Sequence, residues 1–168
     1  MHLNFNSRIT FIDYLISDCD VDKVLDVGSA GLSPNVPEKF RPLARYLAKG
    51  VGTKRGRYTA IDNSIENIQR LKNFFSFDSI KHDDICRPKS LNGQMFSCIY
   101  MGLCLQYFDD ISAAMKNALD HLENGGSIII EVPNVYYLGE LLMVLRRGQN
   151  LLSGDTSNKM LFDHSTLT

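Results

Sequence analysis

The sequence predicts an α/β fold in which a mostly parallel sheet is flanked by helices, giving three layers. Short apolar runs alternate along the chain with longer stretches whose apolar residues recur every three or four positions, which is the pattern of βαβ units. One run, Met95–Met101, is apolar almost throughout, as expected of a strand buried on both faces. A length of 168 residues with 44% hydrophobic residues suits a single domain with a substantial core.

The N-terminal half is expected to contain helices and strands in alternation. Each predicted helix carries an apolar stripe at helical spacing, and each predicted strand is a short run rich in β-branched or aromatic residues. Pro37 suits a first helical turn, Ser64 suits a helix N-cap, and Gly28 ends the first strand in a turn. The predicted helices are Ser7–Ser17, Pro37–Ala48 and Ile65–Phe75, and the predicted strands are Lys23–Val27, Arg57–Asp62 and Ser79–His82.

After the strand at Met95–Met101, the sequence predicts one more helix and one more strand. The helix is expected over Ile111–Leu122, with Asn124-Gly125-Gly126 as its C-cap. The strand is expected over Ser127–Val132, where Pro133 stops it.

Composition and charge exclude several classes of protein. Lys and Arg number 18 against 19 Asp and Glu, so the basic excess typical of nucleic-acid binders is absent. The four cysteines form no C-x-x-C pair, which suits a reducing cytosol better than a disulfide framework or a zinc site. The sequence shows neither the pattern of a signal peptide nor an apolar stretch long enough to span a bilayer. We therefore expect a cytoplasmic protein.

Acidic residues lie at or near the carboxyl ends of three of the predicted strands. In an open α/β sheet ligands bind beyond these ends, and Asp26, Asp62 and the pair Asp83-Asp84 lie in or next to the last residues of the strands. Asp26 would repel a pyrophosphate in the turn at Gly28, but it would attract a nucleoside that carries a sulfonium and an ammonium group. The G-x-G-x-x-G pattern of dinucleotide binders is also absent. The strand ends therefore favour S-adenosylmethionine over NAD as the cofactor.

These segments resemble the class I, seven-strand S-adenosylmethionine-dependent methyltransferases, whose fold is Rossmann-like. The resemblance covers about residues 20–133, which we take as the core of a single domain over 1–168, with 134–168 as a helix and polar tail. No alternating run follows Val132, so the antiparallel strands that complete the resembled sheet are expected to be missing. The matching segments, in order, are Val24–Gly28, Tyr58–Asp62, His82–Ile85, Phe96–Ile99 with Leu105–Asp109, and Leu122–Glu131.

The resemblance implies roles for individual residues. Gly28 and Ala30 would line the methionine end of the cofactor, Asp62 would hold the ribose, and Asp84 would bond the adenine amino group. The implied cofactor-binding residues are Asp26, Gly28, Ser29, Ala30, Gly31, Asp62, Asn63, Asp84, Ile85, Met101 and Leu103. The implied substrate-binding residues are Tyr107, Asn134, Tyr136 and His164. No catalytic residue and no metal ligand is assigned.

Several positions depart from the resembled pattern or have a second interpretation. Ser97 stands where an aspartate is usual, and Tyr107 where a histidine is frequent. Asp62 also suits a helix N-terminus, where a carboxylate is stabilised by the helix dipole. Cys104 is expected to pack in the core, because Leu103 occupies the place of the proline that a nucleophilic cysteine in this loop requires.

The resulting hypothesis is methyl transfer from S-adenosylmethionine to a small-molecule, sugar or lipid-linked acceptor, driven mainly by proximity and orientation. One alternative is a methyltransferase-like binding module without turnover, and another is an NAD(P)-dependent oxidoreductase. The apolar strand at Ser127–Val132 is expected to be an exposed edge that the tail covers or that a second copy pairs with, which would make a homodimer.

Overall fold

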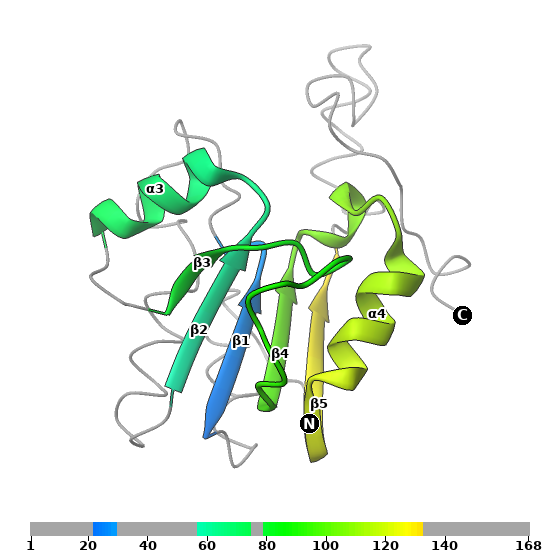
Figure 1. Cartoon of the computed structure of the whole chain (residues 1–168). Coiled ribbons are helices and arrows are strands. Elements are labelled where there is room, and N and C mark those ends of the chain that lie inside the picture. The colour runs from blue at the N-terminus through cyan, green and yellow to red at the C-terminus, as the bar shows by residue number, and fades with distance from the viewer. Residues whose placement is uncertain (1–21, 30–56, 75–78, 133–168) are drawn as a thin grey trace, which may run out of the picture.

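A computed structural model describes residues 22–29, 57–74 and 79–132, which form one five-stranded sheet with helices packed against it (Figure 1). The elements are β1 (Lys23–Val27), β2 (Arg57–Asp62), α3 (Ile65–Phe74), β3 (Ile80–His82), β4 (Phe96–Gly102), the 3-10 helix η2 (Leu105–Tyr107), α4 (Ile111–Asp120) and β5 (Leu122–Glu131). The predicted helices Ser7–Ser17 and Pro37–Ala48 lie outside the described residues. The fold class is confirmed.

The strands follow the spatial order β3-β2-β1-β4-β5, and every neighbouring pair is parallel. The chain runs outward from β1 through β2 to β3, and then crosses to the other side of β1 to form β4 and β5 (Figure 1). The direction of winding therefore reverses between β1 and β4. In open α/β sheets this switch point, at the carboxyl ends of the strands, is where ligands bind.

One face of β1 and β4 packs against α4 and forms the main apolar core. Leu25, Ile99 and Met101 belong to this core and are completely buried. Ala114 and Ala118 of α4 are also completely buried, and their small side chains let the helix approach the sheet closely. Because side chains alternate along a strand, the residues between these core positions point to the opposite face of the sheet.

The link between α4 and β5 differs from the prediction. The helix ends at Asp120 with His121 as its C-cap, so Gly125 and Gly126 are not a helix cap. They lie within β5, where Phe96 pairs with Leu122 but Cys98 pairs with Ser127. The extra residues on β5 form a bulge, and Gly125 takes the left-handed φ of +79° within it. Glycines after a helical pattern are typical of a C-cap, but a bulge needs the same backbone freedom.

Among the described residues β5 forms one edge of the sheet and pairs only with β4. Ile130 on this strand is 40% exposed. The described part of the chain thus agrees with the expectation of an apolar edge strand. The expected cover by the tail involves residues outside the described ranges, and the expected homodimer stays a prediction.

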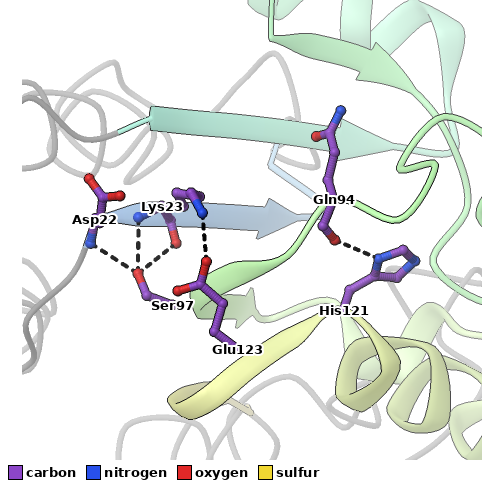
Figure 2. A network of polar contacts seen from close by, with 6 residues as sticks. All are labelled: Asp22, Lys23, Gln94, Ser97, His121 and Glu123. Carbon is purple, nitrogen blue, oxygen red and sulfur yellow. Dashed lines mark hydrogen bonds and ion pairs between the residues drawn. The ribbon is translucent and has the colours of Figure 1, made fainter.

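A polar network closes the amino ends of the central strands (Figure 2). Ser97 Oγ accepts hydrogen bonds from Asp22 N and Lys23 N, both at 2.9 Å, and donates to Lys23 O at 3.1 Å. A hydroxyl has one donor and two acceptor sites, so all three are used. Lys23 also forms an ion pair with Glu123, with 2.6 Å between Nζ and Oε1. Ser97 therefore fixes the start of β1 against β4 at the edge opposite the predicted ligand site.

His121 adds a further contact at the amino-terminal edge. Its Nδ1 lies 2.8 Å from Gln94 O, just before β4 (Figure 2). Its backbone N–H donates to Asn117 O and Ala118 O in the last turn of α4. His121 thus caps α4 and also contacts the segment that leads into β4.

Candidate functional site

The turn after β1 requires glycine at position 28. Gly28 has a φ of +69°, and its N–H donates to Ile61 O of β2 at 2.9 Å. A Cβ added at Gly28 would lie 2.7 Å from Cys104 Cβ, a separation that side chains do not reach without a shift. The loops that follow β1 and β4 therefore touch at Gly28 and Cys104. Cys104 is buried and its Sγ donates to Val27 O at 3.4 Å, in agreement with the packing role expected for it.

Asp26 is buried between strands. The residue is 2% exposed, and its Oδ2 accepts a hydrogen bond from the Tyr58 hydroxyl of β2 at 2.6 Å. Burial first, and then the charge and hydrogen bond of Asp26, raise the pKa of Tyr58 well above its ordinary value. Tyr58 is therefore a neutral donor at physiological pH and Asp26 is its acceptor. Contact between Asp26 and a cofactor stays a prediction.

Asp62 ends β2 and is held by the start of α3. The residue is 4% exposed, and its Oδ1 accepts from Ser64 N at 2.9 Å and from Asn67 Nδ2 at 3.3 Å. Ser64 Oγ in turn accepts from Asn67 N at 3.2 Å, which is the predicted N-cap. The neighbouring Asn63 is exposed, and its carbonyl lies 3.0 Å from His82 Nε2. The carboxylate of Asp62 is thus fixed at the carboxyl edge of the sheet.

The two acids after β3 have different surroundings. Asp83 accepts hydrogen bonds from Ser90 Oγ at 2.7 Å and from the backbone N–H groups of Ser90, Lys89 and Asp84. Burial by itself would raise the pKa of Asp83, but these hydrogen bonds outweigh burial and lower the pKa below its ordinary value. Asp84 is half-buried, and its Oδ1 accepts from Cys86 N at 2.9 Å. Asp83 therefore holds its own loop together, and Asp84 is the more accessible acid.

Two of the apolar residues assigned to the cofactor lie in the core. Ile85 is 2% exposed and belongs to the cluster beneath α4, where Asn117 Nδ2 donates to its carbonyl at 2.9 Å. Met101 is completely buried in the same cluster. Both serve packing in the described part of the chain, and their contact with an adenine ring or another part of the cofactor stays a prediction.

The end of β4 is shaped by Tyr100, Gly102 and Leu103. A Cβ at Gly102 would overlap the Tyr100 ring, whose hydroxyl donates to Glu131 Oε2 of β5 at 2.6 Å. Leu103 follows with a left-handed φ of +53°, which is rare for a branched side chain. Its N–H donates to Glu131 O at 2.9 Å, and its carbonyl accepts from Gln106 Nε2 at 2.8 Å. Non-glycine residues with such backbone angles are concentrated at functional sites.

The structure brings several of the predicted residues to one edge. Gly28 and Ser29 follow β1, Asp62 ends β2, and Leu103 follows β4, all at the carboxyl ends of neighbouring parallel strands. Tyr107 is half-buried in η2 beyond β4, and its N–H donates to Cys104 O at 3.0 Å. The predicted residues Ala30, Gly31, Asn134, Tyr136 and His164 lie outside the described ranges.

Sequence reasoning missed Gln106, which the structure brings to the same edge. Gln106 is 6% exposed and binds the carbonyl of Leu103. Its position after the fourth strand was a usable signal, but glutamine by itself is not specific for any chemistry. In the described ranges, no group of three or more His, Cys, Asp or Glu side chains is arranged to hold a metal ion. None of the described helices is long and apolar enough to cross a membrane.

Comparison with known proteins gives a family match. Residues 41–130 match the family of the methyltransferase domain. No curated protein matches the sequence. The family match covers more than half of the chain and includes β2, α3, β3, β4, α4 and most of β5.

Solved structures share the fold at low identity. DesVI from Streptomyces venezuelae is 17% identical with a TM-score of 0.59, and the alignment covers 75% of this chain and 50% of that one. The plantazolicin methyltransferase BpumL, solved in complex with SAH (S-adenosylhomocysteine), is 20% identical with a TM-score of 0.60, covering 91% and 56%. The sugar N-methyltransferase KedS8 from Streptoalloteichus sp ATCC 53650 is 14% identical with a TM-score of 0.59, covering 81% and 52%. The chain spans about half the length of each of these proteins.

Proposed function

Because the chain belongs to the methyltransferase domain family, we propose that it binds S-adenosylmethionine and transfers the methyl group to a small-molecule or sugar-linked acceptor. The observation that best supports this is the combination of a glycine turn at Gly28 with the buried, fixed carboxylate of Asp62 on the next strand. A carboxylate at the end of the second strand suits the two hydroxyls of a ribose. The residues present thus fit a nucleoside cofactor.

The chain's own contribution to the reaction is binding and orientation. Asp62 would accept hydrogen bonds from the ribose hydroxyls, and Asp84 from the adenine amino group. The backbone of the turn at Gly28 would lie against the methionine end of the cofactor. When bound, S-adenosylmethionine supplies an already activated methyl group for in-line transfer to a nucleophilic atom of the acceptor. Orientation therefore accounts for most of the expected catalysis.

The acceptor class is proposed from the structural relatives and from the earlier sequence resemblance. KedS8 is described as a sugar N-methyltransferase, which makes an amine on a sugar the first acceptor to test. Tyr107, Asn134, Tyr136 and His164 are proposed to contact the acceptor. A lipid-linked acceptor, which the sequence hypothesis also includes, is the second class to test.

Calorimetric titration with S-adenosylhomocysteine and NADH tests the cofactor. Asp62→Asn keeps the shape of the side chain and an oxygen that can accept from Ser64 N, but it removes the charge. Loss of a charge-assisted hydrogen bond weakens binding by about 1.5–3 kcal/mol, or about 10- to 150-fold. Asp83→Asn is the matched control, because Asp83 is a neighbouring carboxylate whose bonds all lie within its own loop. We expect S-adenosylhomocysteine to bind the wild type and the control with similar affinity.

The alternatives predict other results. Binding of NADH without S-adenosylhomocysteine would contradict the proposal and favour an oxidoreductase. Binding of S-adenosylhomocysteine without methyl transfer to amino sugars or other amines would favour a binding module over an enzyme. Equal weakening by Asp62→Asn and Asp83→Asn would mean that Asp62 acts through stability and does not contact the ribose.

A further inference from the structure

Two buried polar atoms have no hydrogen-bond partner within the described part of the chain: Ser29 Oγ and Gln106 Oε1. Ser29 is 3% exposed and Gln106 is 6% exposed, so bulk water does not compensate for the missing bonds. Buried polar side chains are almost always paired in folded proteins, and exceptions often mark a place where a ligand or ion completes the bonding. Such atoms are costly unless something binds them.

Both atoms belong to loops at the switch point of the sheet. Ser29 follows β1 and Gln106 lies in the loop after β4, and these two strands are neighbours on which the winding reverses. The two loops are in contact, because Gly28 leaves just enough room for Cys104. Two independent unpaired atoms therefore occur at the one edge where this topology binds ligands.

The backbone fixes how the Gln106 amide is presented. Its Nε2 donates to the Leu103 carbonyl at 2.8 Å, which identifies the other amide atom as the oxygen. Leu103 adopts its left-handed φ of +53° directly after β4, and this conformation sets the direction of that carbonyl. One N–H of the amide is thus bound to the chain, and the atom left without a partner is Oε1, an acceptor. Ser29 Oγ can either donate or accept.

We propose that Ser29 and Gln106 form a ligand-binding pair in which Gln106 Oε1 accepts a hydrogen bond from an N–H or O–H donor of a molecule bound at the switch point. This inference rests on the proposed function, because the molecule is either the cofactor or the methyl acceptor. In both cases the bound group carries a donor for Gln106 and a polar atom for Ser29. Gln106 is thus assigned as a binding residue.

The first test needs no ligand. Removing a hydroxyl that has no partner leaves the free energy of unfolding unchanged or raises it, whereas removing a bonded hydroxyl lowers it. We expect Ser29→Ala to keep or raise the midpoint of urea unfolding of the ligand-free protein. Ser97→Ala is the matched control, because Ser97 Oγ makes three hydrogen bonds at the opposite edge of the sheet, and its midpoint should fall. A fall for Ser29→Ala as large as for Ser97→Ala would overturn the proposal.

The second test measures binding of S-adenosylhomocysteine by calorimetry to the wild type, Ser29→Ala, Gln106→Leu and Ser97→Ala. If the donor belongs to the cofactor, Ser29→Ala and Gln106→Leu should bind S-adenosylhomocysteine about 10-fold more weakly than the wild type does. Ser97→Ala should bind it with the affinity of the wild type. If the donor belongs to the acceptor, binding is unchanged and the KM for an amino sugar that the wild type methylates rises about 10-fold with kcat unchanged.

The outcomes separate this proposal from the function on which it rests. If the wild type does not bind S-adenosylhomocysteine, both the proposed function and the Ser29–Gln106 binding pair are contradicted. A wild type that binds and turns over, with unchanged affinity and unchanged KM in Ser29→Ala and Gln106→Leu, would overturn the pair and leave the function standing. Should Gln106→Leu fail to fold because it loses the bond to Leu103 O, Ser29→Ala alone decides the result.

Discussion

Gly28→Ala measures how strongly the turn after β1 depends on glycine. The φ of +69° is left-handed, and an L residue there loses about 1–2 kcal/mol. The added Cβ would lie 2.7 Å from Cys104 Cβ, and making room for a methyl group in a packed region costs about 1–3 kcal/mol. We therefore expect the free energy of unfolding to fall by about 2–5 kcal/mol, the sum of the two effects.

Gly93→Ala is a matched control for the backbone contribution. Gly93 also has a φ of +69°, but in the described part of the chain nothing lies within 4 Å of a Cβ added there. Its variant should lose only about 1–2 kcal/mol. Urea unfolding followed by circular dichroism gives both values, provided that the slope with denaturant is the same. If Gly28→Ala loses no more than Gly93→Ala, the contact with Cys104 does not restrict position 28, and the reasoning about this turn is wrong.

Three further substitutions test the polar contacts of the fold. Asp83→Asn should lower the free energy of unfolding by about 1.5–3 kcal/mol at neutral pH. Because the folded pKa of Asp83 is lowered, its contribution to stability is present above its unfolded pKa of about 3.9 and disappears as the pH falls through the folded pKa. The urea midpoints of wild type and variant should therefore converge in acid. Ser97→Ala should lower the free energy of unfolding by about 1–3 kcal/mol, measured by thermal unfolding. The folded variant should bind S-adenosylhomocysteine with the affinity of the wild type. Tyr58→Phe removes the donor to the buried Asp26 carboxylate and should lose about 1–3 kcal/mol in urea unfolding; a neutral result would mean that other groups satisfy Asp26.

The sheet was predictable because its signals are local. β1 begins and ends at the predicted residues, and β2 does as well, since each is a short apolar run bounded by glycine or aspartate. The end of α4 and the use of Gly125 and Gly126 were not predicted correctly. Glycine signals backbone freedom, and the sequence alone does not distinguish a helix end from a bulge.

The chemistry of the strand ends was only partly predictable. The residue types and their order gave Asp62 and Gly28 as candidates, because acids and glycines after strands are visible in the sequence. The bond between Asp26 and Tyr58 depends on which strands are neighbours, so no local pattern reveals it. The unpaired state of Ser29 Oγ and Gln106 Oε1 depends on burial by distant segments, and it becomes visible only in three dimensions.

The contacts of Ser97 also bear on how the chain folds. Ser97 and Lys23 are 74 residues apart in the sequence, so bringing them together closes a long loop. For a flexible loop of that length the conformational entropy lost is about 4 kcal/mol on the logarithmic relation. β1 and β2 pair across a shorter separation, so we expect β4 to join a sheet that β1 and β2 have already begun. The small cluster around one serine hydroxyl would then act late in folding and slow the separation of β1 from β4.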